Sequence, residues 1–448
     1  MDSAPSSGEK PAATSIGRRT SLGVPFLLLL LYPAFDYGRP ANPMGIPMII
    51  AALLFVAWIF APAKKMNLHV VCFFLLLGEM SIGVVTASNN FAAYIATEGM
   101  TLILLCTCIP LIQFVDSLRK IRIFVNVLVL VFIYVGVWAI LSEGRGPGWQ
   151  DENYAAAMMC IAVPLAYFSI PLSERRAVKV FHGVAIGIFL IALIASESRG
   201  GFIGMVGAVL FCVLNSARKK QALIFLVIGA LLVSIVAGPK YWEDMGTITD
   251  TKESTADMRL ELWTIAWQMF LHNPLLGVGP GNYRWRIGDY QSAEQLEKFG
   301  RVLTESVVVH STYFEILSEL GIIGSALFAA ILFRTLKDLR RIRSGVRSGD
   351  VGASNLRHGP ISGHERHGPT DAQQLQYCSM AIMGSLIGYL LSAAFVSFTY
   401  YSHFWLLAAL AAALNEVAKD GAGNPEAPSN PTKGEISMNA RKSSSLVR

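Results

Sequence analysis

The stretch RIFVNVLVLVFIYVGVWAIL at residues 122–141 decides the fold class. It matches the roughly 20 apolar residues that an α-helix needs to cross the hydrocarbon core of a membrane. Comparable apolar stretches recur along the chain at residues 22–36, 44–62, 68–88, 91–115, 154–172, 178–196, 201–217, 221–238, 311–333, 376–396 and 402–418. They predict an all-α, polytopic membrane protein with about 12 transmembrane helices.

The composition agrees with this prediction. Of the 448 residues, 53% are hydrophobic and only 15% are charged, against roughly 25% charged residues in an average soluble protein. This balance excludes a soluble cytosolic enzyme, a disordered protein and a secreted disulfide scaffold. All six cysteines lie inside apolar stretches, so we interpret them as small buried hydrophobic residues and not as disulfides or metal ligands.

The distribution of positive charge predicts the topology. With the N-terminus inside, 27 of the 37 lysine and arginine residues fall on inner segments, as the positive-inside rule requires. The formal net charge of +6 is therefore explained by topology, and nucleic acid is not an expected partner. Both termini are predicted to be cytoplasmic.

The expected organisation has one large loop on each side of the membrane. It comprises an N-terminal tail (1–20), helices 1–9 (21–238), an outer loop (239–310), helices 10–12 (311–418) with a basic inner loop (335–375), and a disordered tail (419–448). The inner loop contains His358, His364 and His367, but its flexible, Gly- and Ser-rich setting argues against a metal site. We therefore expect no metal and no cofactor.

The outer loop contains a predicted helix. Apolar residues recur at helical spacing after Ser254, and Asn273-Pro274 ends the pattern. Arg259, Trp263 and Trp267 are spaced by four residues and are expected to share a face, which suits a helix lying at headgroup level. The glycine-rich stretch 277–281 follows this helix and not a strand, so we interpret it as a tight turn where the backbone approaches a neighbour.

Three outer-face side chains are candidates for chemistry. Arg199 stands where one predicted helix ends and another begins, Arg259 is on the helix of the outer loop, and His310 is where that loop re-enters the membrane. Each also has a simpler explanation: snorkelling to lipid phosphates, surface solvation and a structural histidine, respectively. Together they fit a transferase for a lipid-linked phosphate, in which the arginines neutralise a diphosphate and the histidine deprotonates a hydroxyl.

The motifs around these residues resemble the O-antigen ligase family, which also contains O-antigen polymerases and protein O-oligosaccharyltransferases. The resemblance covers about residues 190–330 and rests on four stretches: Glu197-Ser198-Arg199-Gly200-Gly201, Arg259-x-x-x-Trp263 leading to Asn273-Pro274-Leu275-Leu276-Gly277-Val278-Gly279-Pro280-Gly281-Asn282, His310-Ser311-Thr312-Tyr313-Phe314-Glu315-Ile316-Leu317, and Glu319-Leu320-Gly321-Ile322-Ile323-Gly324. One departure is Ser311, where many members of the family have Asn.

The resemblance implies a reaction and its partners. It implies an enzyme of the bacterial inner membrane that transfers a glycan from undecaprenyl diphosphate to a hydroxyl acceptor on the periplasmic face, without metal and with inversion. Arg199 and Arg259 would bind the diphosphate, and His310 would be the general base. The acceptor stays open among lipid A–core, a growing glycan and a protein Ser or Thr, and surrounding membrane lipids are further partners.

Four other residues are secondary candidates. Glu315 and Glu319 lie one turn apart after His310 and would orient it or replace it as base. Arg145 and Asn153 flank the start of a predicted helix, and the resemblance implies that they touch the sugar, although the acidic residues beside Asn153 are best explained as helix caps. A polysaccharide or lipid transporter is the more remote alternative, but the sequence has no obvious internal repeat.

Overall fold

The computed structural model describes residues 22–39, 45–148, 151–238, 242, 246, 254–348 and 369–421. Within these residues every regular element is helical and there is no strand. The prediction of an all-α chain is therefore confirmed for the described residues. The N-terminal tail, the three histidines His358, His364 and His367, and residues 422–448 lie outside them.

Each predicted apolar stretch coincides with a helix or a run of helices. These are α1 (Val24–Asp36), α2 (Ile46–Ile59), α3 (Leu68–Thr86), the run α4 (Asn90–Ile103), η1 (Leu104–Cys108) and α5 (Ile109–Phe114), α6 (Leu118–Leu141), α7 (Glu152–Ser169), α8 (Arg176–Ala195), α9 (Arg199–Asn215), α10 (Lys219–Val236), α15 (Thr312–Ser348), α16 (Asp371–Ser392) with η4 (Ala393–Phe395), and α17 (Ser402–Gly421).

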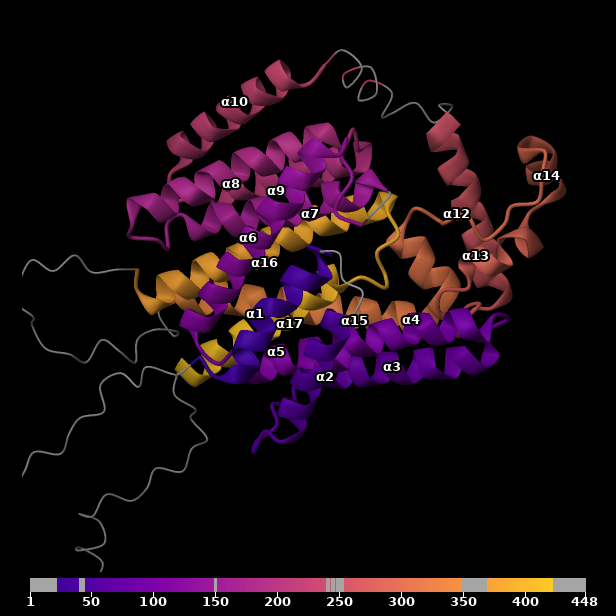
Figure 1. The fold of residues 1–448 in the computed structure, drawn as a ribbon, viewed down its shortest axis with the longest axis horizontal. Coiled ribbons are helices and arrows are strands. Elements are labelled where there is room, and N and C mark those ends of the chain that lie inside the picture. Colours follow the sequence, from indigo (N-terminus) through magenta and orange to yellow (C-terminus); the bar gives the residue numbers. More distant parts are fainter. Residues whose placement is uncertain are drawn as a thin grey trace, which may run out of the picture.

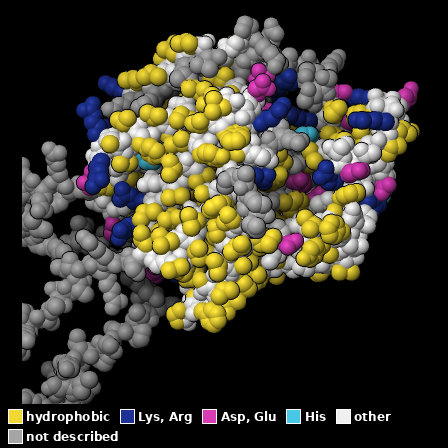
Figure 2. Space-filling view, viewed as in Figure 1, with side chains coloured by type: hydrophobic (Ala, Val, Ile, Leu, Met, Phe, Trp, Pro, Cys, Tyr) yellow, Lys and Arg dark blue, Asp and Glu magenta, His cyan; other side chains and the backbone are white. Residues whose placement is uncertain are grey.

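Six of these helical segments are long and apolar enough to cross a membrane. They are α3, the run α4–η1–α5, α6, α8, α15 as far as Val346, and α16 with η4. Figure 2 shows hydrophobic side chains over the middle of the visible face, with charged side chains gathered mainly toward the two ends. That distribution suits a multi-pass membrane protein. The total of about 12 spans stays a prediction.

Helices cover both ends of the expected inner loop. Residues 335–348 continue α15, and α16 begins at Asp371 with Thr370 as its cap. The extension of α15 is held by polar contacts, because Asp338 accepts hydrogen bonds from Arg334 and Thr335 lies 3.0 Å from Nε2 of His69 on α3. Inside the expected loop, residues 349–368 are outside the described residues.

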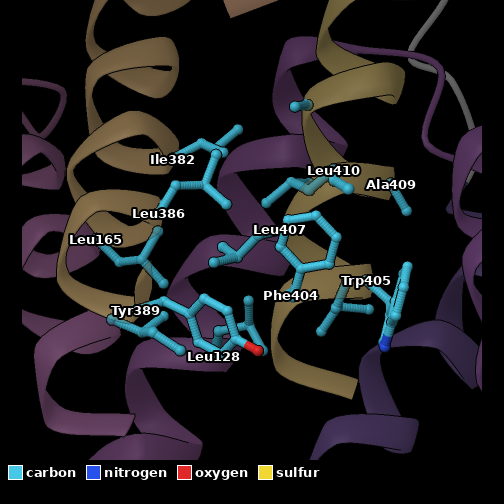
Figure 3. Packing of buried hydrophobic residues seen from close by; sticks show 14 of the residues in the cluster. Leu128, Leu165, Ile382, Leu386, Tyr389, Phe404, Trp405, Leu407, Ala409 and Leu410 are labelled. Carbon is cyan, nitrogen blue, oxygen red and sulfur yellow. The ribbon is translucent and has the colours of Figure 1, made fainter. Parts of the chain in front are cut away.

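The core of the bundle lies where α16 packs between α7, α9 and α17. Figure 3 shows Tyr389, Leu386 and Ile382 facing Phe404 and Leu407, with Leu128 and Leu165 closing the cluster. Phe404 and Trp405 are both essentially buried, and Trp405 donates its indole N–H to the carbonyl of Thr399. The loop between α16 and α17 is in turn bonded to the first turns of α15, through Thr312 and Glu315.

Residues 254–309, most of the loop predicted to be outer and called the outer segment below, form a second, smaller core at one end of the bundle. It contains α12 (Ser254–His272), α13 (Tyr283–Arg286), η2 (Ile287–Tyr290) and α14 (Ala293–Phe299), which lie together in Figure 1. Leu262, Ile265, Met269, Tyr283 and Val309 are among its buried residues. The predicted helix after Ser254 and its end before Asn273-Pro274 are confirmed by α12.

A break in α15 joins the outer segment to the bundle. At Gly321 the backbone leaves the helical region (φ 59°, ψ −156°). The loop after α12 then bonds to the broken turn: Val278 N donates to the carbonyl of Ser318 (2.8 Å), Gly279 N to that of Glu319 (3.0 Å), and Ile322 N to that of Pro274 (2.8 Å). The protein thus satisfies polar groups that the break frees, as irregular backbone in a membrane helix requires.

The glycines at this junction are required by close contact. A Cβ added at Gly277 would lie 2.4 Å from the carbonyl carbon of Glu319, and one at Gly321 would lie 2.5 Å from the carbonyl oxygen of Leu275. Both residues have positive φ. The expectation that stretch 277–281 lets the backbone approach a neighbour is confirmed.

We predict that Gly321→Ala destabilises the protein. Alanine is strained at this positive φ and its Cβ meets backbone that cannot move aside, so the free energy of unfolding should fall by about 2 kcal/mol or more. Thermal unfolding of the purified protein, followed by tryptophan fluorescence, measures the loss. Gly99→Ala in α4 is the control, because its Cβ meets nothing within 4 Å and it should be neutral or slightly stabilising. Equal melting temperatures for the two variants would contradict the prediction.

Candidate functional site

His310 is held at the boundary between the outer core and α15. The residue before it, Val309, is buried and its carbonyl accepts the indole N–H of Trp263 (3.1 Å). On the other side, the Thr312 hydroxyl donates to the carbonyl of Val396 (2.7 Å). His310 itself has a φ of +50°, which few non-glycine residues adopt. The backbone on both sides of His310 is therefore held by contacts from two directions.

His310 lines a cleft of about 380 Å³. The other lining residues are Asp151, Glu152, Asn153, Met258, Arg259 and Leu262. Three segments far apart in the sequence thus meet here: the start of α7, the first turns of α12, and the residue two positions before α15. The structure brings together three of the predicted site residues, His310, Arg259 and Asn153.

A short chain of hydrogen bonds connects the cleft to the start of α9. Asp151 accepts the backbone N–H and the side-chain amide of Asn153 (2.9 and 2.7 Å). The Asn153 carbonyl oxygen accepts the Ser198 hydroxyl (2.6 Å), whose oxygen accepts Gly201 N–H (3.0 Å) and caps α9. Arg199 follows Ser198 directly, although its side chain is not among the described residues that line the cleft.

The surroundings of His310 favour a neutral imidazole. Burial lowers the pKa of His310 from its ordinary value, Asp151 raises it, and Arg259 lowers it, with a net decrease. The Nδ1 atom of His310 is buried and has no hydrogen-bond partner within the described residues. A neutral ring near neutral pH is the form that can accept a proton.

Sequence reasoning missed Asp151 and Glu152 as residues of the cleft. It interpreted them as helix caps, and Asp151 does cap α7 through Asn153 N–H. The same carboxylate also faces the cleft and affects the pKa of His310. The acidic pair Asp151-Glu152 is visible in the sequence, but only the tertiary structure shows that the start of α7 lies opposite α12.

The structure places the predicted face of α12 at two different surfaces, with Arg259 at one and Trp263 and Trp267 at the other. Arg259 lines the polar cleft, whereas both tryptophans line an apolar groove of about 540 Å³ with Leu260, Thr264, Tyr313, Phe314 and Leu317. Trp263 stacks on Phe314 with ring centroids 5.3 Å apart. The expectation was wrong because a helix turns about 100° per residue, so Arg259 and Trp267 point in directions about 80° apart.

Glu319 binds the glycine-rich loop and does not line the cleft. Its two carboxylate oxygens accept Tyr283 N–H (2.8 Å) and Gly281 N–H (2.8 Å), and Tyr400 donates its hydroxyl to the same group. Glu315 likewise accepts Thr399 N–H (3.1 Å). Within the described residues no hydrogen bond joins either carboxylate to His310. Both glutamates therefore hold loops in place.

The remaining candidate, Arg145, is exposed in the turn after α6. Its backbone N–H donates to the carbonyl of Ser142 (3.1 Å), and the cleft lining does not include it among the described residues. A search of the described residues finds no group of three or more His, Cys, Asp or Glu side chains placed to hold a metal ion.

Comparisons with known proteins find similarity over the segment that contains Arg259 and His310. Residues 184–329 match the family model described as O-Antigen ligase. Two curated relatives are named "Putative polysaccharide ligase". The one from Rickettsia conorii is 24% identical over 169 residues, which are 36% of this chain and 41% of the relative. The one from Rickettsia typhi is 26% identical over 180 residues, which are 39% of this chain and 43% of the relative.

The matches confirm the family resemblance over this part of the chain. They span about two-fifths of the length of these relatives. The matched segment contains Arg199, Arg259, His310, Glu315 and Glu319. Asp151 and Asn153, which complete the cleft, lie before it.

We predict that Glu319→Ala destabilises the junction between the loop and α15. The change leaves the Tyr283 N–H and the Tyr400 hydroxyl without their acceptor, whereas the Gly281 N–H keeps the Tyr400 oxygen (3.1 Å), and each buried unpaired donor costs roughly 1–3 kcal/mol. The free energy of unfolding should fall by about 2 kcal/mol or more, measured by thermal unfolding. Tyr400→Phe removes only the hydroxyl and should cost about 1 kcal/mol. The assignment fails if Glu319→Ala melts like the unaltered protein.

Proposed function

We propose that this chain, whose residues 184–329 form an O-antigen ligase region, transfers a glycan from undecaprenyl diphosphate to a hydroxyl acceptor on the periplasmic face of the bacterial inner membrane. The observation that carries the proposal is the shared cleft of His310 and Arg259, a proton acceptor beside a fixed cation. Asn153 extends it toward the turn that bears Arg199, through its bond with Ser198.

In the proposed reaction the acceptor oxygen attacks the anomeric carbon of the donor glycan. A new carbon–oxygen bond forms, the bond from that carbon to the diphosphate oxygen breaks, and undecaprenyl diphosphate leaves with the electron pair. His310 takes the proton of the acceptor hydroxyl. Attack from the side opposite the leaving group inverts the anomeric carbon.

The arginines supply positive charge to the leaving group. Negative charge grows on the diphosphate as its bond to the glycan breaks, and guanidinium groups bind phosphate oxygens through paired N–H donors. Arg259 is placed on α12 in the cleft, and Arg199 begins α9 beside the Asn153–Ser198 bridge. The proposed reaction uses no metal and no organic cofactor.

A direct assay shows which molecule accepts the glycan. Purified protein is incubated with an undecaprenyl-diphosphate glycan and, in turn, with lipid A–core, a second glycan donor and a protein rich in Ser and Thr. Mass analysis of the products then shows which hydroxyl was glycosylated. Our proposal names lipid A–core; chain lengthening would instead indicate a polymerase, and a glycosylated protein an O-oligosaccharyltransferase. No product with any acceptor would contradict glycan transfer.

We predict that His310→Ala abolishes transfer and preserves donor binding. Loss of the base should lower the turnover rate by a factor of about 10² to 10⁴. Turnover and binding of the glycan donor are measured separately on the same preparation. His272→Ala is the matched control, because His272 is exposed on α12, does not line the cleft, and contacts only the carbonyl of Gln268 and the edge of the Tyr290 ring among the described residues. A fully active His310→Ala protein would remove this residue from the mechanism.

We predict that Asp151→Asn moves the acid limb of the pH–rate profile to lower pH. The carboxylate of Asp151 raises the pKa of His310, so its removal lowers that pKa further and His310 stays neutral to a lower pH. The maximal rate should also fall, since a weaker base accepts the proton less readily. Asparagine still caps α7, which keeps the fold intact. Glu152→Gln, a second carboxylate of the cleft, is the control. A limb that stays in place or moves to higher pH contradicts the prediction.

A further inference from the structure

The turn between α8 and α9 is held in an uncommon backbone conformation. Glu197 has a φ of +48°, which few non-glycine residues adopt. On one side of it, Ser196 donates its hydroxyl to the carbonyl of Leu193 (2.6 Å) and accepts the backbone N–H of Ser198 (3.3 Å). On the other side, the Ser198 hydroxyl oxygen accepts the N–H of Gly201 (3.0 Å). A strained residue persists only where its surroundings hold it, and here the two serines do so.

The first turn of α9 is also tightly packed against its neighbours. A Cβ added at Gly200 would lie 2.6 Å from the Cβ of Phe395 in η4, and one at Gly201 would lie 2.5 Å from the Cβ of Ala156 on α7. The start of α9 is therefore pressed between η4 and α7. Because Arg199 is the first residue of α9, its backbone is fixed relative to both.

Asn153 links this turn to the cleft. Its side-chain carbonyl oxygen accepts the Ser198 hydroxyl (2.6 Å), and its amide N–H donates to Asp151 (2.7 Å), which lines the cleft with His310. Both ends of the Asn153 amide thus bind protein groups. The buried Ser198 hydroxyl acts in two ways at once, because it caps α9 through Gly201 N–H and donates across to α7.

We propose that Ser198 and Asn153 are positioning residues, which hold Arg199 where it binds the diphosphate of the donor. This role rests on the proposed function, in which Arg199 and Arg259 bind that group. A guanidinium group presents its N–H donors as a rigid fork, so its grip on a phosphate depends on its distance and angle. Without the bridge from Ser198 to Asn153, the first turn of α9 loses its hydrogen bond to α7. This role differs from the contact with the sugar that the resemblance implies for Asn153.

Binding of undecaprenyl diphosphate to the purified full chain tests the bridge. Ser198→Ala should weaken binding about tenfold, since one hydrogen bond that orients a charged group is lost. Asn153→Ala breaks the same bridge from α7 and leaves the Ser198 cap of α9 in place, so it should weaken binding to the same extent. The double variant Ser198→Ala, Asn153→Ala should bind no more weakly than either single variant, because both changes remove one interaction.

A second comparison tests whether the bridge acts through Arg199. Arg199→Ala should itself weaken binding, and Ser198→Ala added to it should cause no further loss. Ser117→Ala is the matched control, because Ser117 caps α6 by accepting Lys120 N–H (3.4 Å) and does not line the cleft. It removes a helix cap of the same kind and should leave the affinity unchanged. Melting temperatures of all variants show that each remains folded.

Three results would overturn the positioning role. They are unchanged affinity in both single variants of the bridge, an equal loss in the Ser117→Ala control, and additive losses from Ser198→Ala and Arg199→Ala. Failure of the unaltered protein to bind undecaprenyl diphosphate is a separate outcome, which would contradict the proposed function and this role with it.

Discussion

The carboxylate of Glu319 is the contact on which the arrangement of the outer segment depends. It is buried in α15 and accepts hydrogen bonds from the backbone of Gly281 and Tyr283 and from the hydroxyl of Tyr400. One side chain thus ties the loop after α12, the start of α13 and the loop before α17 to one turn of helix. Burial raises the pKa of Tyr400, so its phenol stays protonated and remains a donor. Without this group, the Tyr283 N–H and the Tyr400 hydroxyl would lack an acceptor.

The position of the cleft follows from that junction. The junction fixes the end of α12, Trp263 on the same helix bonds to the carbonyl before His310, and Arg259 is one turn away from Trp263. The opposite wall is the start of α7. A break in a membrane helix is costly unless protein groups satisfy its backbone. Here the same loop satisfies the break and orients the helix that bears Arg259.

Charged side chains are concentrated at the two ends of the bundle. At one end, carboxylates, an arginine and a histidine meet in a cleft, where Asp151 raises the pKa of His310 and Arg259 lowers it. At the other end, Lys179 and Arg218 line a crevice, as the predicted excess of Lys and Arg on inner segments leads one to expect. Figure 2 shows hydrophobic side chains between the two groups of charges.

The sequence by itself determined the all-helical chain, the helix after Ser254 and the close approach at the glycine-rich turn, because apolar length, periodicity and glycine spacing are local properties. It also indicated that Arg259 and His310 act in the same reaction. Only the tertiary structure decided that Asp151 joins them, that Glu315 and Glu319 hold loops, and that Arg259 and Trp267 face different surfaces. These outcomes depend on contacts between residues at least 36 positions apart or on helix rotation, and local pattern does not specify either.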